Sequence, residues 1–188
     1  MNSTAVWLGI YGAWRLACRD RDAAKYFETS VPGVLRSFWA GAICYPGFFI
    51  LLLLRPDAPQ GGAFLHALII QTLGYVIQWT AYPLMALPFC RWLVPEERAL
   101  GFIAAYNWSQ TLQTGLVVVS ALIGATGLFS PDLSGWMDAT IYLFCLVYEW
   151  FIARIMLQAG GLPATALVLL DVVISAIVLQ VSSILAAS

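Results

Sequence analysis

The sequence predicts an all-α membrane protein in which five transmembrane helices follow an N-terminal amphipathic interfacial helix. Of the 188 residues, 61% are hydrophobic and only 10% are charged, whereas a soluble domain has roughly 45–50% apolar and about 25% charged residues. A soluble fold of this size cannot keep so much apolar surface dispersed with so little charge. Five apolar stretches are separated by short turns, and each is long enough for a spanning helix, which needs about 20 residues.

Charge and cysteine content exclude several classes of partner and cofactor. The formal net charge is −1, so no strong field attracts nucleic acid. The four cysteines form no C-x-x-C pair and lie in separate apolar segments, which favours free thiols over a disulfide framework or metal site. They are Cys18, Cys44, Cys90 and Cys145. We expect no cofactor, because the single histidine, His66, cannot supply the several ligands of a zinc or haem site.

Residues 1–30 form an amphipathic segment on the cytoplasmic side. One helical face carries Val6, Trp7, Ile10, Trp14 and Ala17, and another carries Arg15, Arg19 and Asp22. The apolar run is too short to span, and it lacks the preceding basic residues of a signal peptide, so we expect it to be retained. The pattern favours a helix lying in the cytoplasmic interface. Packing of this helix beneath the bundle is the open alternative.

Residues 31–188 are predicted to form a single transmembrane bundle. Ser30 and Pro32 suit the start of a helix, and Pro83 and Pro88 are expected to kink the second span near its cytoplasmic end. Turn residues separate the spans at 55–62, 130–135 and 160–163. The expected spans are about 34–54, 63–90, 99–125, 136–156 and 162–185.

The basic residues predict the orientation. With a cytoplasmic N-terminus, eight of the nine lie on the cytoplasmic side and only Arg55 lies outside, as the positive-inside rule requires. The eight are Arg15, Arg19, Arg21, Lys25, Arg36, Arg91, Arg98 and Arg154. An odd number of spans then leaves the C-terminus on the non-cytoplasmic side.

Polar residues within the apolar stretches mark a candidate intramembrane site. By helix rise, Asp171 lies roughly 15 Å and Asn107 roughly 14 Å from the cytoplasmic ends of their spans, so both are near the midplane. Tyr82 lies at a similar level and Glu149 is shallower, where it is expected to meet Arg154 or Arg36. The full candidate set is Asp171, Asn107, Gln110, Gln78, Tyr82 and Glu149.

These polar residues also share helical faces. The three faces are Gln71, Tyr75 and Gln78 on the second span, Asn107, Gln110 and Thr114 on the third, and Asp171, Ser175 and Ser182 on the last. Because buried polar groups need partners, we expect the three faces to meet. We also expect Asp171 to be protonated or strongly hydrogen-bonded beside Asn107. Two interpretations are open: a polar pathway or small-molecule site, and interhelical hydrogen bonds worth about 0.6 kcal/mol each.

Enzyme chemistry is not expected. The sequence has no glycine-rich phosphate loop and no G-x-S-x-G, and its loops are too short to hold a catalytic domain. No nucleophile and base pair is visible, which disfavours an enzyme acting on lipids. We therefore assign no catalytic residues.

Two short motifs carry a resemblance to a known family. They are Ala104-Ala-Tyr-Asn-Trp108 and Tyr148-Glu-Trp150 with Arg154. The chain resembles small, uncharacterised inner-membrane proteins of alphaproteobacteria and, more distantly, the bacterial branch of the Yip family. The resemblance implies five helices, a cytoplasmic N-terminus and the bacterial inner membrane. Eukaryotic Yip members assist vesicle trafficking and membrane shaping, and the family supplies no catalytic residues to transfer.

Two hypotheses of function follow. The first is a non-enzymatic membrane scaffold, assembly factor or subunit of a larger complex, which rests on the short loops and the Yip-like layout. The alternative is a small transporter or channel with a midplane polar site around Asp171. The expected partners are the lipid bilayer and either other membrane proteins or further copies of this chain.

Overall fold

A computed structural model of the chain describes residues 3–55 and 62–187. All the regular elements in these ranges are helical, which confirms the predicted all-α class. In chain order they are α1 Ser3–Ala17, the 3-10 helix η1 Arg21–Tyr26, α2 Val31–Ser37, α3 Trp39–Leu53, α4 Gly62–Leu93, α5 Glu96–Ala125, α6 Pro131–Leu157 and α7 Gly161–Ala187.

The start of α2 follows the expected local chemistry, whereas the turn expected at 130–135 is wrong, because α6 begins at Pro131 with Ser130 as its cap. The Ser30 hydroxyl accepts a hydrogen bond from the Gly33 amide and caps α2, with proline following in the first turn. The expected helix 34–54 is interrupted at Phe38, where α2 ends and α3 begins. Helix α4 continues through Pro83 and Pro88. Most of the expected turn at 55–62 lies outside the described residues.

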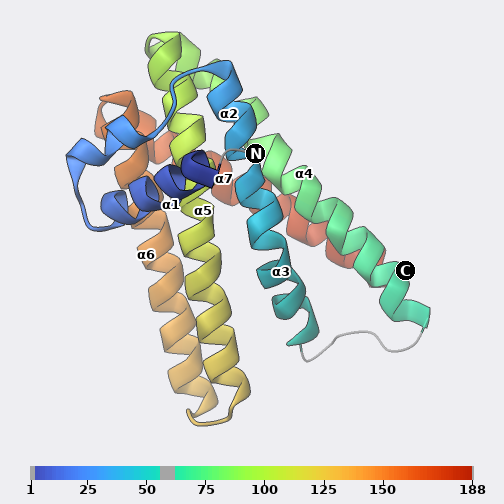
Figure 1. The fold of residues 1–188 in the computed structure, drawn as a ribbon. Helices are drawn as coiled ribbons and strands as arrows, with labels where there is room; N and C mark the ends of the chain where they lie inside the picture. The colour runs from blue at the N-terminus through green and yellow to red at the C-terminus, as the bar shows by residue number, and fades with distance from the viewer. Residues whose placement is uncertain (1–2, 56–61, 188) are drawn as a thin grey trace.

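The long helices form two pairs that diverge from a common end. Helix α4 packs along α7, and α5 packs along α6, with α3 beside α5 (Figure 1). The pairs meet where α4 leads into α5 and α6 leads into α7. They separate toward the α5–α6 turn and the end of α7 (Figure 1). Helix α5 contacts α1, α2, α3, α4 and α6, so it is the central element.

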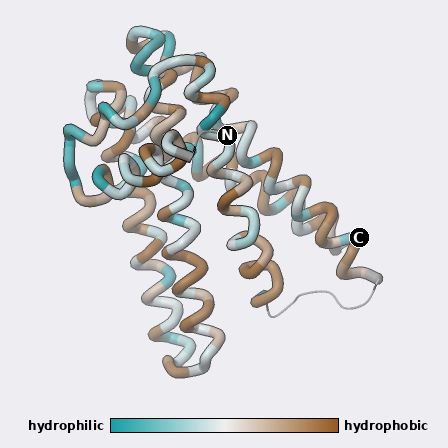
Figure 2. Tube along the Cα trace, viewed as in Figure 1, coloured by the Kyte–Doolittle hydropathy of each residue, from teal (hydrophilic) through white to brown (hydrophobic). Residues whose placement is uncertain are grey.

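The two halves of α5 have different surroundings. An unbroken run of residues from Ala99 to Ser109 is buried, because α1, α2, α4 and α6 cover this half. Beyond it, Leu116, Val119 and Leu122 are exposed. Figure 2 shows that this exposed half is mainly hydrophobic. The joined end is therefore buried by protein, and the diverging end exposes apolar side chains.

Within residues 3–55 and 62–187, three segments are long and apolar enough to cross a membrane: Val31–Leu53, Pro131–Leu157 and Gly161–Ala186. Helices α4 and α5 are also long, at 32 and 30 residues, but they carry more polar side chains. Membrane association is thus indicated.

Helix α1 lies across α5 and α6 (Figure 1). Gly9 rests on the indole of Trp108, so closely that a Cβ at this position would lie 2.5 Å from the ring. The Tyr148 hydroxyl donates a 2.6 Å hydrogen bond to the carbonyl of Ala13. Helix α1 is therefore docked on the bundle through its small residues, which is the alternative that the sequence analysis left open.

The aromatic face expected on α1 is divided in the structure. Trp7 is 72% and Trp14 is 58% exposed, whereas Val6 and Ile10 pack partly against the core. The two indoles thus point away from the bundle, where a membrane interface would receive amphipathic rings.

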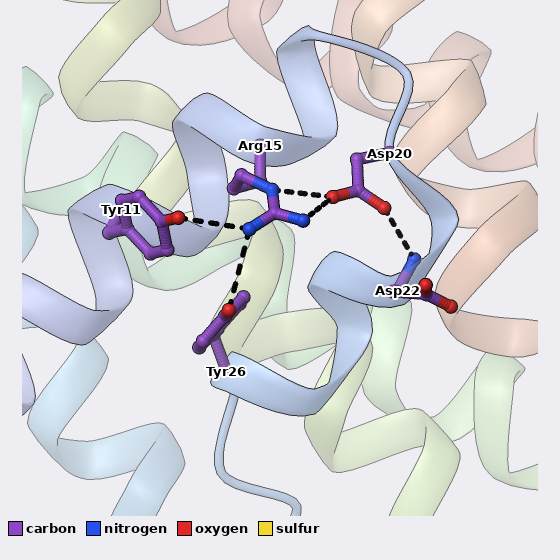
Figure 3. Close-up of polar contacts among 5 residues, drawn as sticks. All are labelled: Tyr11, Arg15, Asp20, Asp22 and Tyr26. Atoms are coloured by element: carbon purple, nitrogen blue, oxygen red, sulfur yellow. Dashed lines mark hydrogen bonds and ion pairs between the residues drawn. The ribbon is translucent and has the colours of Figure 1, made fainter.

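A polar cluster joins α1 to η1 (Figure 3). The Arg15 guanidinium forms an ion pair with Asp20 and donates hydrogen bonds to the hydroxyls of Tyr11, at 2.9 Å, and Tyr26, at 3.5 Å. The Asp22 amide donates to Asp20, which caps η1. This amide, followed by Arg15, lowers the pKa of Asp20, and the bonds to Tyr11 and Asp20 raise the pKa of Arg15. The cluster fixes the turn that folds η1 beneath α1.

Candidate functional site

A cavity of about 520 Å³ lies between α3, α5, α6 and α7, and Tyr75 of α4 also lines it. Its walls include apolar side chains such as Phe48, Leu51 and Ile141. Polar side chains from three helices also line it: Gln110, Gln113, Asp138, Glu149, Asp171 and Ser175. Concave sites of about 300–1,000 Å³ with apolar walls and a few polar groups are typical of small-molecule binding. The cavity is therefore the candidate functional site.

Asp171 lies at one boundary of the cavity and is held by α5. Its Oδ1 accepts a 2.7 Å hydrogen bond from the buried hydroxyl of Tyr106. The Tyr106 ring packs on the ring of Tyr82, with centroids 4.2 Å apart. Asp171 thus has the strong hydrogen bond expected of it, but the donor is Tyr106 and not the expected Asn107.

Glu149 is the least satisfied polar group of the cavity. Its side chain is buried, with the residue only 7% exposed, although it belongs to the cavity lining. Oε1 accepts a 3.3 Å hydrogen bond from the amide of Gln110, and Oε2 is buried with no hydrogen-bond partner among the described residues. A buried acceptor without a donor costs about 1–3 kcal/mol, and more when it is charged. An occupant of the cavity would remove this cost.

The expected pairing of Glu149 with an arginine is wrong. Arg36 instead forms an ion pair with Glu28, outside the cavity. The Arg154 guanidinium lies 5.3 Å from the ring centroid of Trp150. Glu149 lies five residues before Arg154, about 140° around α6 at about 100° per residue, so the two side chains are on different faces and Glu149 points toward α5. Its partner is therefore an amide and not a cation.

The other three candidate residues lie outside the cavity lining. Gln78 donates a 2.6 Å hydrogen bond to Ser175 of α7, and Asn107 donates a 2.8 Å hydrogen bond to Ser37 of α2. Tyr82 makes the ring contact described above. The expected meeting of the polar faces of α4 and α7 is present, since Ser182 also donates to Gln71 at 3.4 Å. These contacts join helices, whereas Asp171, Gln110 and Glu149 face the cavity.

Sequence reasoning missed three residues of the site: Tyr106, Gln113 and Asp138. Tyr106, Gln110 and Gln113 recur at helical spacing of four and three, which was a readable signal. Asp138 accepts a 2.6 Å hydrogen bond from Ser120 and joins the diverging halves of α5 and α6. It was missed because it lies near the end of its span, where a polar side chain needs no special explanation.

The carboxyl groups of the lining have no basic side chain beside them in the lining. The lining includes three carboxyl groups, from Asp138, Glu149 and Asp171, and it contains no lysine, arginine or histidine. His66 is exposed near the start of α4. Across residues 3–55 and 62–187, no group of three His, Cys, Asp or Glu side chains is arranged to hold a metal ion.

Comparisons with protein-family models, with curated proteins and with solved structures find no match to this chain. The resemblance to the Yip family therefore stays a prediction.

Proposed function

We propose that the chain is a small membrane transporter or channel that binds its solute in the cavity lined by α3, α4, α5, α6 and α7. The observation that carries the proposal is Glu149, a buried carboxyl group with an unpartnered oxygen beside a cavity of small-molecule size. Among the described residues, Gln78 Oε1 and Asn107 Oδ1 are also buried without a partner, but only Glu149 also lines the cavity, where a solute could compensate it. The function involves no catalysis and no cofactor.

The proposal places five spans in the bilayer: α2 with α3, then α4, α5, α6 and α7. Helices α4 and α5 are less apolar than the others because much of their polar surface faces the cavity or another helix. Gln78 meets α7, and Gln110 meets α6. Interior helices of a bundle tolerate such residues, which are costly only against lipid.

The orientation follows from the basic residues. Eight of the nine lie on α1, η1 and α2, in the turn between α1 and η1, or near the joined ends of α4, α5 and α6, and Arg55 follows α3 at the opposite end. We place the joined end and the N-terminus in the cytoplasm of a bacterial cell, with the C-terminus beyond the inner membrane. Trp7 and Trp14 then lie at the cytoplasmic interface.

The cavity gives a route with one closed end. From Asp138 to Glu149 it extends roughly 16 Å along α6, at 1.5 Å per residue. Beyond Glu149, the Tyr106–Asp171 hydrogen bond and the packed ring of Tyr82 separate it from the buried half of α5. We propose that solute enters from the non-cytoplasmic side past Asp138. Passage to the cytoplasm then requires movement of Tyr106 relative to Asp171.

The scaffold, assembly-factor and complex-subunit hypothesis stays a prediction. It rests on short loops and the Yip-like layout, whereas the transporter proposal also has a specific site. Copurification in mild detergent with the same partner, together with an absence of flux, would reverse this order.

The test is solute flux into liposomes containing the purified chain. Glu149→Gln should lower the flux of a transported solute at least about tenfold, because it removes a charge-assisted contact worth about 1.5–3 kcal/mol. Asp132→Asn is the matched control, since Asp132 is exposed in the first turn of α6 outside the cavity lining. Flux that is equal in protein-containing and empty liposomes for cationic, neutral and anionic solutes would contradict the proposal.

A further inference from the structure

We infer that the solute of this cavity is an organic ammonium ion, a protonated amine with a small apolar body. The inference rests on the proposed function and names its substrate class. It depends on three features of the same cavity: the sign of its charge, the unpartnered oxygen of Glu149 and its aromatic wall.

The charge of the lining selects a cation. Three carboxyl groups face the cavity without a basic side chain in the lining to offset them. An anionic solute would be repelled in a low-dielectric site, where charge interactions are stronger than in water. A neutral solute would leave the carboxyl groups without compensation.

The unpartnered oxygen selects a hydrogen-bond donor. Oε2 of Glu149 is buried without a donor, while the neighbouring Oε1 is already bonded to Gln110. Asp171 offers a second carboxyl group in the lining, anchored through Oδ1 by Tyr106. An ammonium group has several N–H donors and no acceptor, so it can bond to Oε2 and to a second oxygen of the cavity. Such charge-assisted hydrogen bonds are about twice as strong as neutral ones.

The remaining walls select an organic cation over a bare metal ion. Phe48 and Tyr75 lie side by side with ring centroids 4.7 Å apart, and both line the cavity with Tyr142. Aromatic faces attract cations and cover hydrocarbon. A hard metal ion takes about six or more oxygen ligands in a tight shell, which makes no use of a cavity of about 520 Å³ with aromatic and aliphatic walls.

The experiment compares three four-carbon probes of similar size and one inorganic cation on the full chain in lipid nanodiscs. The probes are n-butylammonium, 1-butanol, butyrate and potassium ion, and binding is followed by calorimetry. We expect n-butylammonium to bind at least about tenfold more tightly than each of the others, because only it combines charge, donors and an apolar body. Glu149→Gln should lower its affinity at least about tenfold, and Asp132→Asn should leave it unchanged.

The outcomes separate this inference from the function on which it rests. Equal or tighter binding of 1-butanol or butyrate overturns the ammonium class, but it leaves a solute-binding cavity. If potassium binds as tightly as n-butylammonium, the claim that the solute is an organic cation is overturned, and the cavity is a simple cation site. Loss of n-butylammonium binding overturns the inference even if liposome flux of another solute persists. The probe comparison uses the unmodified chain, so a variant that fails to fold does not affect it.

Discussion

The joined end and the diverging end of the bundle contain the same helices but differ in packing: the first is buried by neighbouring helices, and the second surrounds a cavity. At the joined end, α5 is buried by α1, α2, α4 and α6 through small residues and aromatic rings, and the buried polar atom of this half of α5 without a partner among the described residues is Oδ1 of Asn107. At the diverging end, α5 and α6 separate from α7 around a cavity that contains carboxyl groups. Packing at the joined end therefore stabilises the fold. The cavity at the diverging end lowers stability, because one of its carboxyl oxygens has no hydrogen-bond donor among the described residues.

Two glycines provide the strongest test of this contrast. Gly9→Val should destabilise the chain by about 2–3 kcal/mol, because the added side chain would clash with Trp108 and such overpacking costs about 1–3 kcal/mol. Gly115→Ala, at the diverging end of α5, meets nothing within 4 Å. It should be neutral or stabilise the helix by up to about 1 kcal/mol. Denaturant unfolding in detergent measures both, and equal effects would contradict the contrast.

The Asp171–Tyr106 pair should show the next largest effect. Asp171→Leu leaves the buried Tyr106 hydroxyl without an acceptor, which costs about 1–2 kcal/mol. Asp171→Asn keeps an acceptor and should fold almost as well as the native chain. In Asp171→Leu combined with Tyr106→Phe, much of the loss should return, because both polar groups are gone. Additive losses in this double-mutant cycle would show that the two side chains are not coupled.

A smaller effect is expected for the hydrogen bond between α2 and α5. Ser37→Ala removes the acceptor of Asn107 and should cost about 0.6 kcal/mol, the average for interhelical bonds in membrane proteins. Solute affinity should not change, because neither residue lines the cavity. Unfolding and calorimetry on the same sample separate the two readouts, and a loss of solute affinity would place Asn107 in the site.

The contact between α1 and η1 should show the smallest effect, and only at low pH. The pKa of Asp20 is lowered in the folded chain, so its contribution is present above the unfolded value of about 3.9 and is lost as pH falls through the folded value. Hydrogen exchange over residues 11–26 should thus be unchanged from pH 8 to about pH 5 after correction for intrinsic rates, and faster below about pH 4. Asp20→Asn should give the faster exchange at pH 7, whereas Asp22→Asn should not, because Asp22 contributes its backbone amide.

The helices could be read from the sequence because hydropathy and turn residues mark them directly. Two features of the fold could not. The break at Phe38 has no glycine or proline at that position, so it follows from packing and not from local propensity. The docking of α1 depends on Gly9 fitting against Trp108, far away in the sequence. The indoles of α1 dominated its sequence pattern, so the contact made by Gly9 on another face of the helix was not predicted.

Part of the site was predicted from the sequence, and the errors have a geometric cause. Asp171, Gln110 and Glu149 were predicted as site residues because acidic and amide side chains are rare within membrane spans. All three line the cavity. Asn107 carries the same signal but lies about 100° around the helix from Tyr106, so it faces α2. The position of each residue along its helix was predictable. The direction in which its side chain points from the helix axis depends on which neighbours pack against each face, and this was not predictable. Tyr106 was missed because aromatic residues are common in any buried helix, although its spacing from Gln110 and Gln113 places the three on one face.

The most direct test of the account is whether water reaches the cavity but not the outer surface of the same helix. In a cysteine-free background, Val117→Cys places a thiol in the cavity lining, and Val119→Cys places one on an exposed apolar face of α5 outside this cavity. A membrane-impermeant cationic methanethiosulfonate reagent, added to whole cells, should modify residue 117 and not residue 119, because a thiol facing lipid does not ionise. Protection of residue 117 by n-butylammonium would complete the result. Equal labelling at both positions, or labelling at 119 alone, would contradict a water-filled solute cavity between the diverging helices.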